Sequence, residues 1–389
     1  MSYNELMNAL FSKKPQFTNF SLKDVKAVAK ALGNPERSFP CVHIAGTNGK
    51  GSVALKVARA LEMSGLKVGL FTSPHLFSYR ERIEINRVMI TEEEIISRLV
   101  YLMSLIEEIY PSASFFDIST FLAFSYFKEQ KIDIAVIEAG IGGKVDTTNI
   151  ITPLVSVITS VGNDHKDVLG GSIEQIAAHK AGIIKPSVPV VIGPFADFRV
   201  IHQAAKENKS YVHTVKRAPG FYDWENQNIA RKTLEVLSNI LPLNDEAIEQ
   251  GLLIRPLCRF EQIGGVIFDV AHNPDGFSKL TEALGTFFSN RKWAFIVGMV
   301  KEKDIHASLS ILSKKASHLY LVEISSKRSA SPEKMGEILL EEGVSAFTTC
   351  FSIEKAIDLA LSQEDLIVVC GSFYLMQEAR SFLFRKVGA

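Results

Sequence analysis

Three glycines surround a lysine in the segment AGTNGKGSVALK. Gly46, Gly49 and Gly51 follow a β-branched run and precede an amphipathic helical pattern that Ser52 opens. Glycines let a backbone approach an anion closely, and the first turn of a helix offers unpaired N–H groups. Lys50 is placed to reach the β and γ phosphates of a nucleotide, and the Ser52 hydroxyl to hold Mg²⁺. The segment therefore predicts a phosphate-binding loop.

The loop departs from the strict Walker pattern, which needs glycine at Ile44 and Ser or Thr where Gly51 stands. A simple glycine turn is the alternative, but it gives no reason for a lysine between glycines. A second glycine cluster, EAGIGGKVDTTN, is not a dinucleotide fingerprint, because a GxGxxG pattern from Gly140 needs glycine at Val145. A nicotinamide enzyme is therefore not expected.

The charge balance of the chain excludes several classes of partner. Its 389 residues carry 43 Lys plus Arg and 43 Asp plus Glu, so no long-range field gathers nucleic acid or an anionic membrane. The first residues, MSYNELMNALFSKK, do not fit a signal peptide, and no apolar run approaches the ~18 residues that span a bilayer. The four scattered cysteines are predicted to be buried reduced thiols. We expect a cytoplasmic monomer that binds neither nucleic acid nor membranes.

Short β-branched runs alternate with helical patterns along nearly the whole chain, which is typical of βαβ units and a parallel sheet. Besides the runs CVHIAG and LKVGLFTS, strands are predicted at 132–139, 154–160 and 188–193, and helices at 92–109 and 172–184. The aromatic-rich run SFFDISTFLAFSYF is predicted to be a core helix. Residues 241–260 hold two prolines around one short helical pattern, which favours a hinge there.

A second alternation of strands and helices begins beyond this hinge. Its strands are VIFDV, WAFIVG, HLYLVEI and LIVVCG, and its helices lie near 275–289, 304–315, 331–343 and 372–385. We therefore predict an α/β protein of two domains. Residues 1–255 form a doubly wound P-loop-type ATPase domain, and residues 256–389 a smaller Rossmann-like domain.

Nine motifs, in order, resemble those of the folylpolyglutamate synthase and dihydrofolate synthase family, the folate branch of the ATP-dependent Mur ligases. They are AGTNGKGS, FTSPHL, RERIEIN, IEAGIGGKVDTTN, ITSVGNDH, HKAGIIK, FDVAHNPDG, GMVKEKD and CGSFYL. The resemblance implies a ligase that adds L-glutamate to dihydropteroate, or to reduced folate and its polyglutamates, through an acyl phosphate. ATP is then a co-substrate, two Mg²⁺ sites are expected, and K⁺ is a further candidate ion.

The resemblance assigns metal contacts to Ser52, Ser73, Glu138 and His165. Hard oxygen ligands with one imidazole suit Mg²⁺, which keeps several waters and uses few protein groups. Glu138 ends a buried strand, where a carboxylate needs a cation or hydrogen-bond donors. From the residues alone, Glu138 could equally well be a metal ligand or a paired buried acid, and His165 is interpreted as a loop-capping residue.

Lys50, Lys180 and His165 are the catalytic residues that the resemblance implies. Lys180 corresponds to the lysine that carries a CO₂-derived carbamate in family members, which would turn a cation into an anion near the second metal. The alternative is an ordinary lysine that ends a helix and interacts with its dipole.

The remaining site residues are also implied by the resemblance. Those for ATP are Thr47, Asn48, Gly49, Lys50, Gly51, Ser52, Asn226 (with Asn228 as the fallback), Arg259 and Asp269. Those for the other substrates are Arg82, Phe116, Thr120, His272, Asn273 and Ser372, with Lys303 and Asp304 on the phosphate side. Without the resemblance, Asp269 would be interpreted as an Asx turn before Pro274 and Arg82 as a surface cation.

Some positions depart from the family pattern. Asn19 and Asp24 stand where members that use dihydropteroate commonly have Asp and Arg, Asn163 stands for Leu, and Lys144 for Arg. None belongs to the phosphate or metal set.

Two other functions compete with this one. A Mur enzyme that extends a peptidoglycan precursor usually carries a UDP-binding domain before the loop, whereas 45 residues precede Gly46. A non-catalytic ATP-binding switch would bind nucleotide without releasing phosphate in response to an amino acid.

Overall fold

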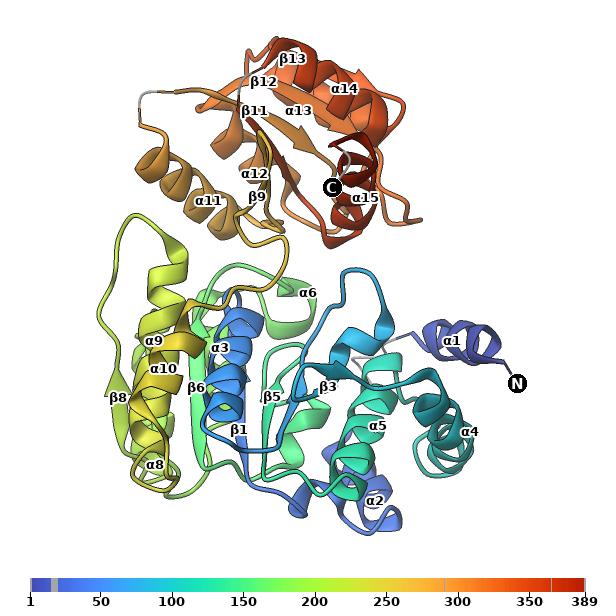
Figure 1. The fold of residues 1–389 in the computed structure, drawn as a ribbon, viewed down its shortest axis with the longest axis vertical. Helices are drawn as coiled ribbons and strands as arrows, with labels where there is room; N and C mark the ends of the chain where they lie inside the picture. The colour runs from blue at the N-terminus through green and yellow to red at the C-terminus, as the bar shows by residue number, and fades with distance from the viewer. Residues whose placement is uncertain (1, 15–19, 290, 365, 388–389) are drawn as a thin grey trace. The chain divides into compact units, whose positions relative to one another are not determined.

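The computed structural model describes residues 2–14, 20–289, 291–364 and 366–387. The chain divides into two compact units. The first unit is Met1–Arg217 with Glu225–Arg255, and the second is Ala218–Trp224 with Pro256–Ala389. Each unit is built on its own sheet with helices on both faces, as Figure 1 shows. The α/β class with two doubly wound sheets, predicted from the alternation of strands and helices, is confirmed.

The sheet of the first unit has eight strands in the order β4-β3-β2-β5-β1-β6-β7-β8. Their bounds are β1 (Cys41–Ala45), β2 (Val68–Phe71), β3 (Ile83–Ile85), β4 (Val88–Met89), β5 (Ile134–Glu138), β6 (Val155–Ser160), β7 (Val190–Phe195) and β8 (Val212–Thr214). The strands from β2 to β8 along this order run parallel, and β3 and β4 add an antiparallel edge. Because β1 lies between β5 and β6, the segments that follow these three strands meet at one edge of the sheet.

Alternate residues of β1 face opposite layers of helices, as the two-residue period of a strand requires. Val42 and Ile44 face a core with α3 (Lys50–Met63), α9 (Tyr222–Leu237) and α10 (Asp245–Leu253). Cys41 and Ala45 face the opposite side. That side is covered by α1 (Tyr3–Ser12), α2 (Leu22–Ala31), α4 (Glu92–Ile109), α5 (Phe115–Glu129), α7 (Ile173–Ala181) and α8 (Arg199–Glu207). The aromatic run predicted as a core helix is α5, and most of its residues are buried.

Short helical turns connect several of these elements. They are η2 (Pro35–Arg37), η3 (Tyr79–Arg82), η4 (Thr147–Ile150) and α6 (Lys166–Leu169). The longer helices begin at side-chain caps: Thr91 accepts the N–H of Glu94 at the start of α4, and Ser114 forms a capping box with Asp117 at the start of α5.

The sheet of the second unit has six strands in the order β13-β12-β11-β14-β10-β9, and β9 pairs antiparallel at its edge. The strands are β9 (Glu261–Ile263), β10 (Val266–Phe268), β11 (Trp293–Val297), β12 (Ala316–Val322), β13 (Phe347–Cys350) and β14 (Ile367–Cys370). The helices are α11 (Pro274–Phe287), α12 (Ile305–Ser313), α13 (Pro332–Glu341), α14 (Ile353–Gln363) and α15 (Phe373–Val387). A buried core fills the space between the sheet and α11, α12 and α13.

Residues 218–224 belong to the second unit, whereas the sequence placed them in the first domain. The ring of Phe221 lies 5.2 Å from that of Phe260 and 5.1 Å from that of Phe287. Tyr222, at the start of α9, donates its hydroxyl to Asp269. Helical periodicity could not show this, because α9 continues without a break from one unit into the other.

All four cysteines are buried and free, as predicted. No helix within the described residues is long and apolar enough to cross a bilayer.

Candidate active site

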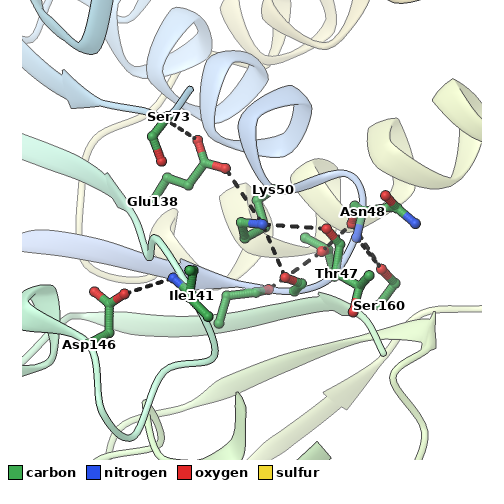
Figure 2. A network of polar contacts seen from close by, with 11 residues as sticks. Thr47, Asn48, Lys50, Ser73, Glu138, Ile141, Asp146 and Ser160 are labelled. Atoms are coloured by element: carbon green, nitrogen blue, oxygen red, sulfur yellow. Dashed lines mark hydrogen bonds and ion pairs between the residues drawn. The ribbon is translucent and has the colours of Figure 1, made fainter. Parts of the chain in front are cut away.

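The loop between β1 and α3 is held by the polar end of β6. The carbonyl of Asn48 accepts hydrogen bonds from Thr159 Oγ1 at 2.7 Å and Ser160 Oγ at 2.9 Å, and its N–H donates to Ser160 Oγ at 2.9 Å. Thr47 donates its N–H to the Ser160 carbonyl at 2.9 Å and accepts the N–H of Gly162 on Oγ1 at 2.9 Å. Figure 2 shows this network, which fixes the loop shape through side chains of the adjacent strand.

Two of the loop glycines leave no room for a side chain. A Cβ on Gly46 would lie 1.9 Å from Thr159 Oγ1, and a Cβ on Gly49 would lie 2.5 Å from Asn226 Oδ1. Gly49 also has φ of 86°, a left-handed conformation that favours glycine, and α3 begins at the next residue. The free N–H groups of the first turn are therefore presented by a tightly packed loop, as anion binding requires.

Lys50 and Glu138 form an ion pair at the start of α3. Lys50 Nζ lies 3.9 Å from Glu138 Oε1 and donates to the carbonyl oxygens of Gly46 at 3.1 Å and Thr47 at 3.4 Å. The Glu138 side chain is 3% exposed, and its Oε2 accepts the N–H of Ser73 at 3.0 Å. Figure 2 shows the amine between the loop carbonyls and the carboxylate. Glu138 is thus a buried acid that is paired with Lys50 and oriented toward the phosphate-binding loop.

Ser52 and Glu138 are of the residue types that hold a divalent metal. Ser52 is buried in the first turn of α3, and the Glu138 carboxylate would lie 3.3 Å from a Cβ on Gly51 in the same turn. Carboxylate and hydroxyl oxygens are the ligand types that Mg²⁺ prefers. Within the described residues, no three His, Cys, Asp or Glu side chains cluster as a metal site, but the predicted set holds only one carboxylate and one imidazole, so this finding does not test it.

Lys180 lies near the end of α7 and is 2% exposed. Burial and, after it, the Lys50 cation lower the pKa of Lys180 to about 7, while Asp164 acts in the opposite direction. A substantial fraction of this amine is therefore neutral near pH 7, unlike that of a solvated lysine at a helix end.

The loop after Glu138 is closed by Asp146. Its Oδ2 accepts the N–H of Ile141 at 2.9 Å, a bond drawn in Figure 2, and its Oδ1 accepts the N–H of Thr148 at 3.0 Å. Thr148 Oγ1 also donates to Asp146 and lies 2.8 Å from His43 Nε2. Burial raises the pKa of Asp146 to about 6, whereas its hydrogen bonds act to lower it. Asp146 thus shapes the glycine loop that follows Glu138.

Arg82 ends the short helix η3 and is 6% exposed, so its interpretation as a surface cation is wrong. Its Nε donates to His75 Nδ1 at 2.8 Å, and its guanidinium carbon lies 4.7 Å from the centre of the Phe115 ring. Burial and the Arg82 charge lower the pKa of His75 to about 4, so His75 is a neutral acceptor. This contact with His75 and Phe115 holds the guanidinium in place.

Phe116 and Thr120 lie on the first two turns of α5. The Phe116 ring lies 5.7 Å from that of Phe71, and its nearest atom would be 2.7 Å from a Cβ on Gly140. Thr120 is fully buried and donates Oγ1 to the Phe116 carbonyl at 2.9 Å. The first turns of α5 therefore pack directly against the loop after Glu138.

Asp269 follows β10 in the second unit and is 3% exposed. It accepts hydrogen bonds from the Tyr222 hydroxyl, from the N–H of Phe260 at 2.9 Å and from the N–H of Ala271 at 2.8 Å. The last contact is the predicted Asx turn. Burial raises the pKa of Asp269, whereas Tyr222 and the Arg259 cation act to lower it.

Two other predicted residues of the second unit lie beside the ring of Phe373. The Arg259 guanidinium carbon lies 4.9 Å from its centre, and the His272 ring lies 5.7 Å from it. Asn273 is 2% exposed and caps α11, and Ser372 is 4% exposed just before α15. Arg259 and His272 therefore lie beside one aromatic ring, and Ser372 immediately precedes Phe373 in the chain.

Other predicted residues are exposed or lie where helices begin. His165 is exposed and occupies the N-cap position of α6 with φ of 52°, Asp304 caps α12 with Lys303 just before it, and Asn228 is exposed. Asn226, not the fallback Asn228, is the asparagine that meets the phosphate loop. Of the departures from the family pattern, Asn19 lies outside the described residues.

Thr159 and Ser160 position the loop but were not among the residues predicted from the sequence. They are two polar residues at the end of a mostly apolar run, LVSVITS. A polar residue at the carboxyl end of a parallel strand is a signal for a site residue, because such strands bring these ends to the same edge of the sheet.

Two family models cover most of the chain. The Mur ligase middle domain matches residues 44–254, and the Mur ligase, glutamate ligase domain matches residues 258–373. Among curated relatives, the folylpolyglutamate synthase of Lacticaseibacillus casei is 33% identical over 98% of this chain and 99% of its own. The dihydrofolate synthase/folylpolyglutamate synthase of Bacillus subtilis is 28% identical over 92% of this chain and 94% of its own.

Several solved structures also match this chain over nearly its whole length. E. coli FolC in complex with DHPP and ADP has a TM-score of 0.91 at 27% identity, covering 100% of this chain and 99% of its own. The bifunctional enzyme of Yersinia pestis, complexed with AMPPNP and Mn ion, has a TM-score of 0.89 at 28% identity, covering 100% and 98%. Together with the phosphate loop and its Lys50–Glu138 pair, these matches show that the chain belongs to the folylpolyglutamate synthase/dihydrofolate synthase family of Mur ligases.

Proposed function

We propose that this protein is an ATP-dependent ligase that joins L-glutamate to dihydropteroate, or to reduced folate and its polyglutamates. The observation that carries the proposal is the phosphate loop whose Lys50 lies 3.9 Å from the buried Glu138. The relatives support it by what they are named for and bind: folylpolyglutamate synthesis in L. casei, and DHPP with ADP in E. coli FolC.

In the first step the γ-phosphoryl group moves to the carboxylate of the acceptor and forms an acyl phosphate. Two anions must approach each other, so positive charge has to lie between them. Lys50 and the free N–H groups at the start of α3 supply it from the protein. A divalent metal, held by Ser52, Ser73, Glu138 and His165, supplies further charge neutralisation when bound.

In the second step the amine of glutamate attacks the acyl carbon, and phosphate leaves from the tetrahedral intermediate. A phosphate is a good leaving group, so orientation contributes more than a strong protein base. We assign Arg82, His272, Asn273 and Ser372 to the carboxylates and amine of glutamate. Arg259, Asp269 and Asn226 are assigned to the nucleotide, and Phe116 and Thr120 to the pterin.

We assign a carbamate to Lys180. The neutral amine attacks the carbon of CO₂, an N–C bond forms, one C=O electron pair moves to oxygen, and one N–H proton leaves to water. Its near-complete burial and its pKa of about 7 favour the neutral amine that this step needs. The resulting anion offsets the nearby Lys50 charge.

The finer parts of the assignment are also proposals. Residues 1–255 bind ATP, with the folate site at the edge of this domain, and residues 256–389 contact glutamate and nucleotide. Two Mg²⁺ ions act in the reaction and K⁺ is a further ion, and the protein works as a monomer in the cytoplasm.

The deciding experiment measures phosphate release from ATP with L-glutamate, separately with dihydropteroate and with a reduced folate. We expect release to depend on glutamate with at least one acceptor. Nucleotide binding without glutamate-dependent release under either condition would instead favour a non-catalytic switch and reject the ligase.

A further inference from the structure

The end of α7 is tied to the loop between Glu138 and η4 on both sides of Lys180. The N–H of Lys144 donates to the His179 carbonyl at 2.7 Å, one residue before Lys180. The side-chain amide of Asn149 donates to the Gly182 carbonyl at 3.0 Å, two residues after it. These two bonds fix the backbone from which the Lys180 side chain extends.

Close packing makes this attachment rigid. A Cβ on Gly143 would lie 3.0 Å from the carbonyl oxygen of His179 and 3.1 Å from that of Lys180. A Cβ on Gly182 would lie 2.5 Å from the Cα of Lys144. Gly182 has φ of −62°, which any residue adopts, so the close approach of the two backbones, not the conformation, requires glycine there.

Asn149 is hydrogen-bonded through its backbone as well as through its side chain. It is 7% exposed, its N–H donates to the Asp146 carbonyl at 2.9 Å, and its own carbonyl accepts Lys185 Nζ at 2.7 Å. Within the part of the chain that the structure describes, its buried Oδ1 has no hydrogen-bond partner. A buried polar atom without a partner is unfavourable, so the contribution of this side chain comes from the hydrogen bonds that its Nδ2 donates.

We propose that Asn149 is a positioning residue for Lys180, acting through the Gly182 carbonyl to hold the last turn of α7 where the Lys180 amine meets CO₂ and lies beside Lys50. The inference rests on the proposed carbamate. It assigns a role to a residue outside the predicted nucleotide and metal contacts, and it predicts that the carbamate weakens when the amide donor is removed.

The test measures the carbamate directly. Purified wild type, Lys180→Ala and Asn149→Ala are equilibrated with ¹³C-bicarbonate and examined by ¹³C NMR. We expect a carbamate signal in wild type and none in Lys180→Ala. In Asn149→Ala we expect the occupancy at ambient CO₂ and kcat both to fall at least fivefold, with KM for ATP changed less than twofold. Raised bicarbonate should restore both in Asn149→Ala by mass action, but not in Lys180→Ala.

Two further variants serve as a matched control and as a replacement for Asn149→Ala. Asn208→Ala is the matched control, because the Asn208 amide donates to the Ala204 carbonyl near the end of α8 at 2.9 Å and belongs to no contact with α7 described above. It should keep wild-type occupancy and kcat. Asn149→Asp has nearly the shape of asparagine and lacks the amide donor, so it serves if Asn149→Ala fails to fold.

The outcomes separate the inference from the proposed function. Wild-type occupancy and kcat in both Asn149 variants would overturn the inference, as would a loss of kcat that bicarbonate leaves unchanged. Absence of the signal from wild type would remove the carbamate and the inference together. The ligase assignment would then still be decided by glutamate-dependent phosphate release.

Discussion

The hydroxyl of Thr148 determines where the proton of His43 lies. Thr148 Oγ1 has one hydrogen and donates it to Asp146, so it meets His43 Nε2 at 2.8 Å as an acceptor. His43 Nε2 therefore carries the proton, and the buried Nδ1 carries none and has no hydrogen-bond partner among the described residues. Complete burial and then the Lys185 charge lower the pKa of His43 to about 3. The imidazole is thus neutral and held in one tautomer.

This histidine makes stability depend on pH. The folded pKa of about 3 lies below the unfolded value of 6.5, so below pH 6.5 the unfolded state binds more protons and stability falls as pH falls. Between pH 7 and pH 5 the contribution of His43 should fall by about 2 kcal/mol. Urea unfolding of wild type and His43→Gln at both pH values measures this, because Asp146 and the other groups are present in both proteins. Equal pH dependence in the two proteins would contradict it.

At the scale of elements, α3 connects the phosphate loop to α10. Lys56, in the middle of α3, is fully buried, and its amine donates to the carbonyl oxygens of Leu252 and Ile254, each at 2.8 Å. Carbonyls at a helix end lack partners within the helix and carry its negative pole, so they suit a buried cation. A Cβ on Gly251 would lie 2.5 Å from the Ala60 nitrogen, which shows how closely the two helices pack.

Replacing Lys56 by Met should therefore lower the free energy of unfolding by about 3 kcal/mol, because the carbonyl oxygens of Leu252 and Ile254 lose a charged donor. The matched control is Lys232→Met on α9, where the partly exposed lysine pairs with Glu235 and the expected change is within about 0.5 kcal/mol. Urea unfolding of the three proteins provides the comparison. A loss no larger in Lys56→Met than in the control would show that the buried amine contributes little.

The features that could be predicted from the sequence depend on residues close together in the chain. The helix at 92–109 is α4 to the residue, and the glycine loop was found because its strand, glycines, lysine and helix are contiguous. The partners of Lys56 could not be predicted, since the Leu252 carbonyl lies 196 residues away. The same holds for Asn226 against Gly49 and for Asn149 against Gly182, because tertiary packing alone brings these pairs together.

At the scale of the whole molecule, the chain has no net charge, so its anionic substrates are bound by single, well-placed cations. A nucleotide that binds only the folded state stabilises it by about 2.7 kcal/mol at a hundred times its Kd. We expect AMPPNP with Mg²⁺ to raise the Tm of wild type and of Lys206→Met, an exposed lysine on α8, to the same extent. Lys50→Met should show little or no shift at that concentration in thermal unfolding, and a full shift would remove Lys50 from the phosphate site.

The chain passes between its two units three times, after Arg217, Trp224 and Arg255, and the second passage lies within α9. A single protease cut between Arg255 and Pro256 would therefore release neither unit. A chimera that joins two relatives at residue 255 would keep Tyr222 from one parent and take Asp269, which accepts the hydrogen bond of Tyr222, from the other. An exchange of the whole second unit would have to carry residues 218–224 along with residues 256–389, two segments that are separate in the sequence.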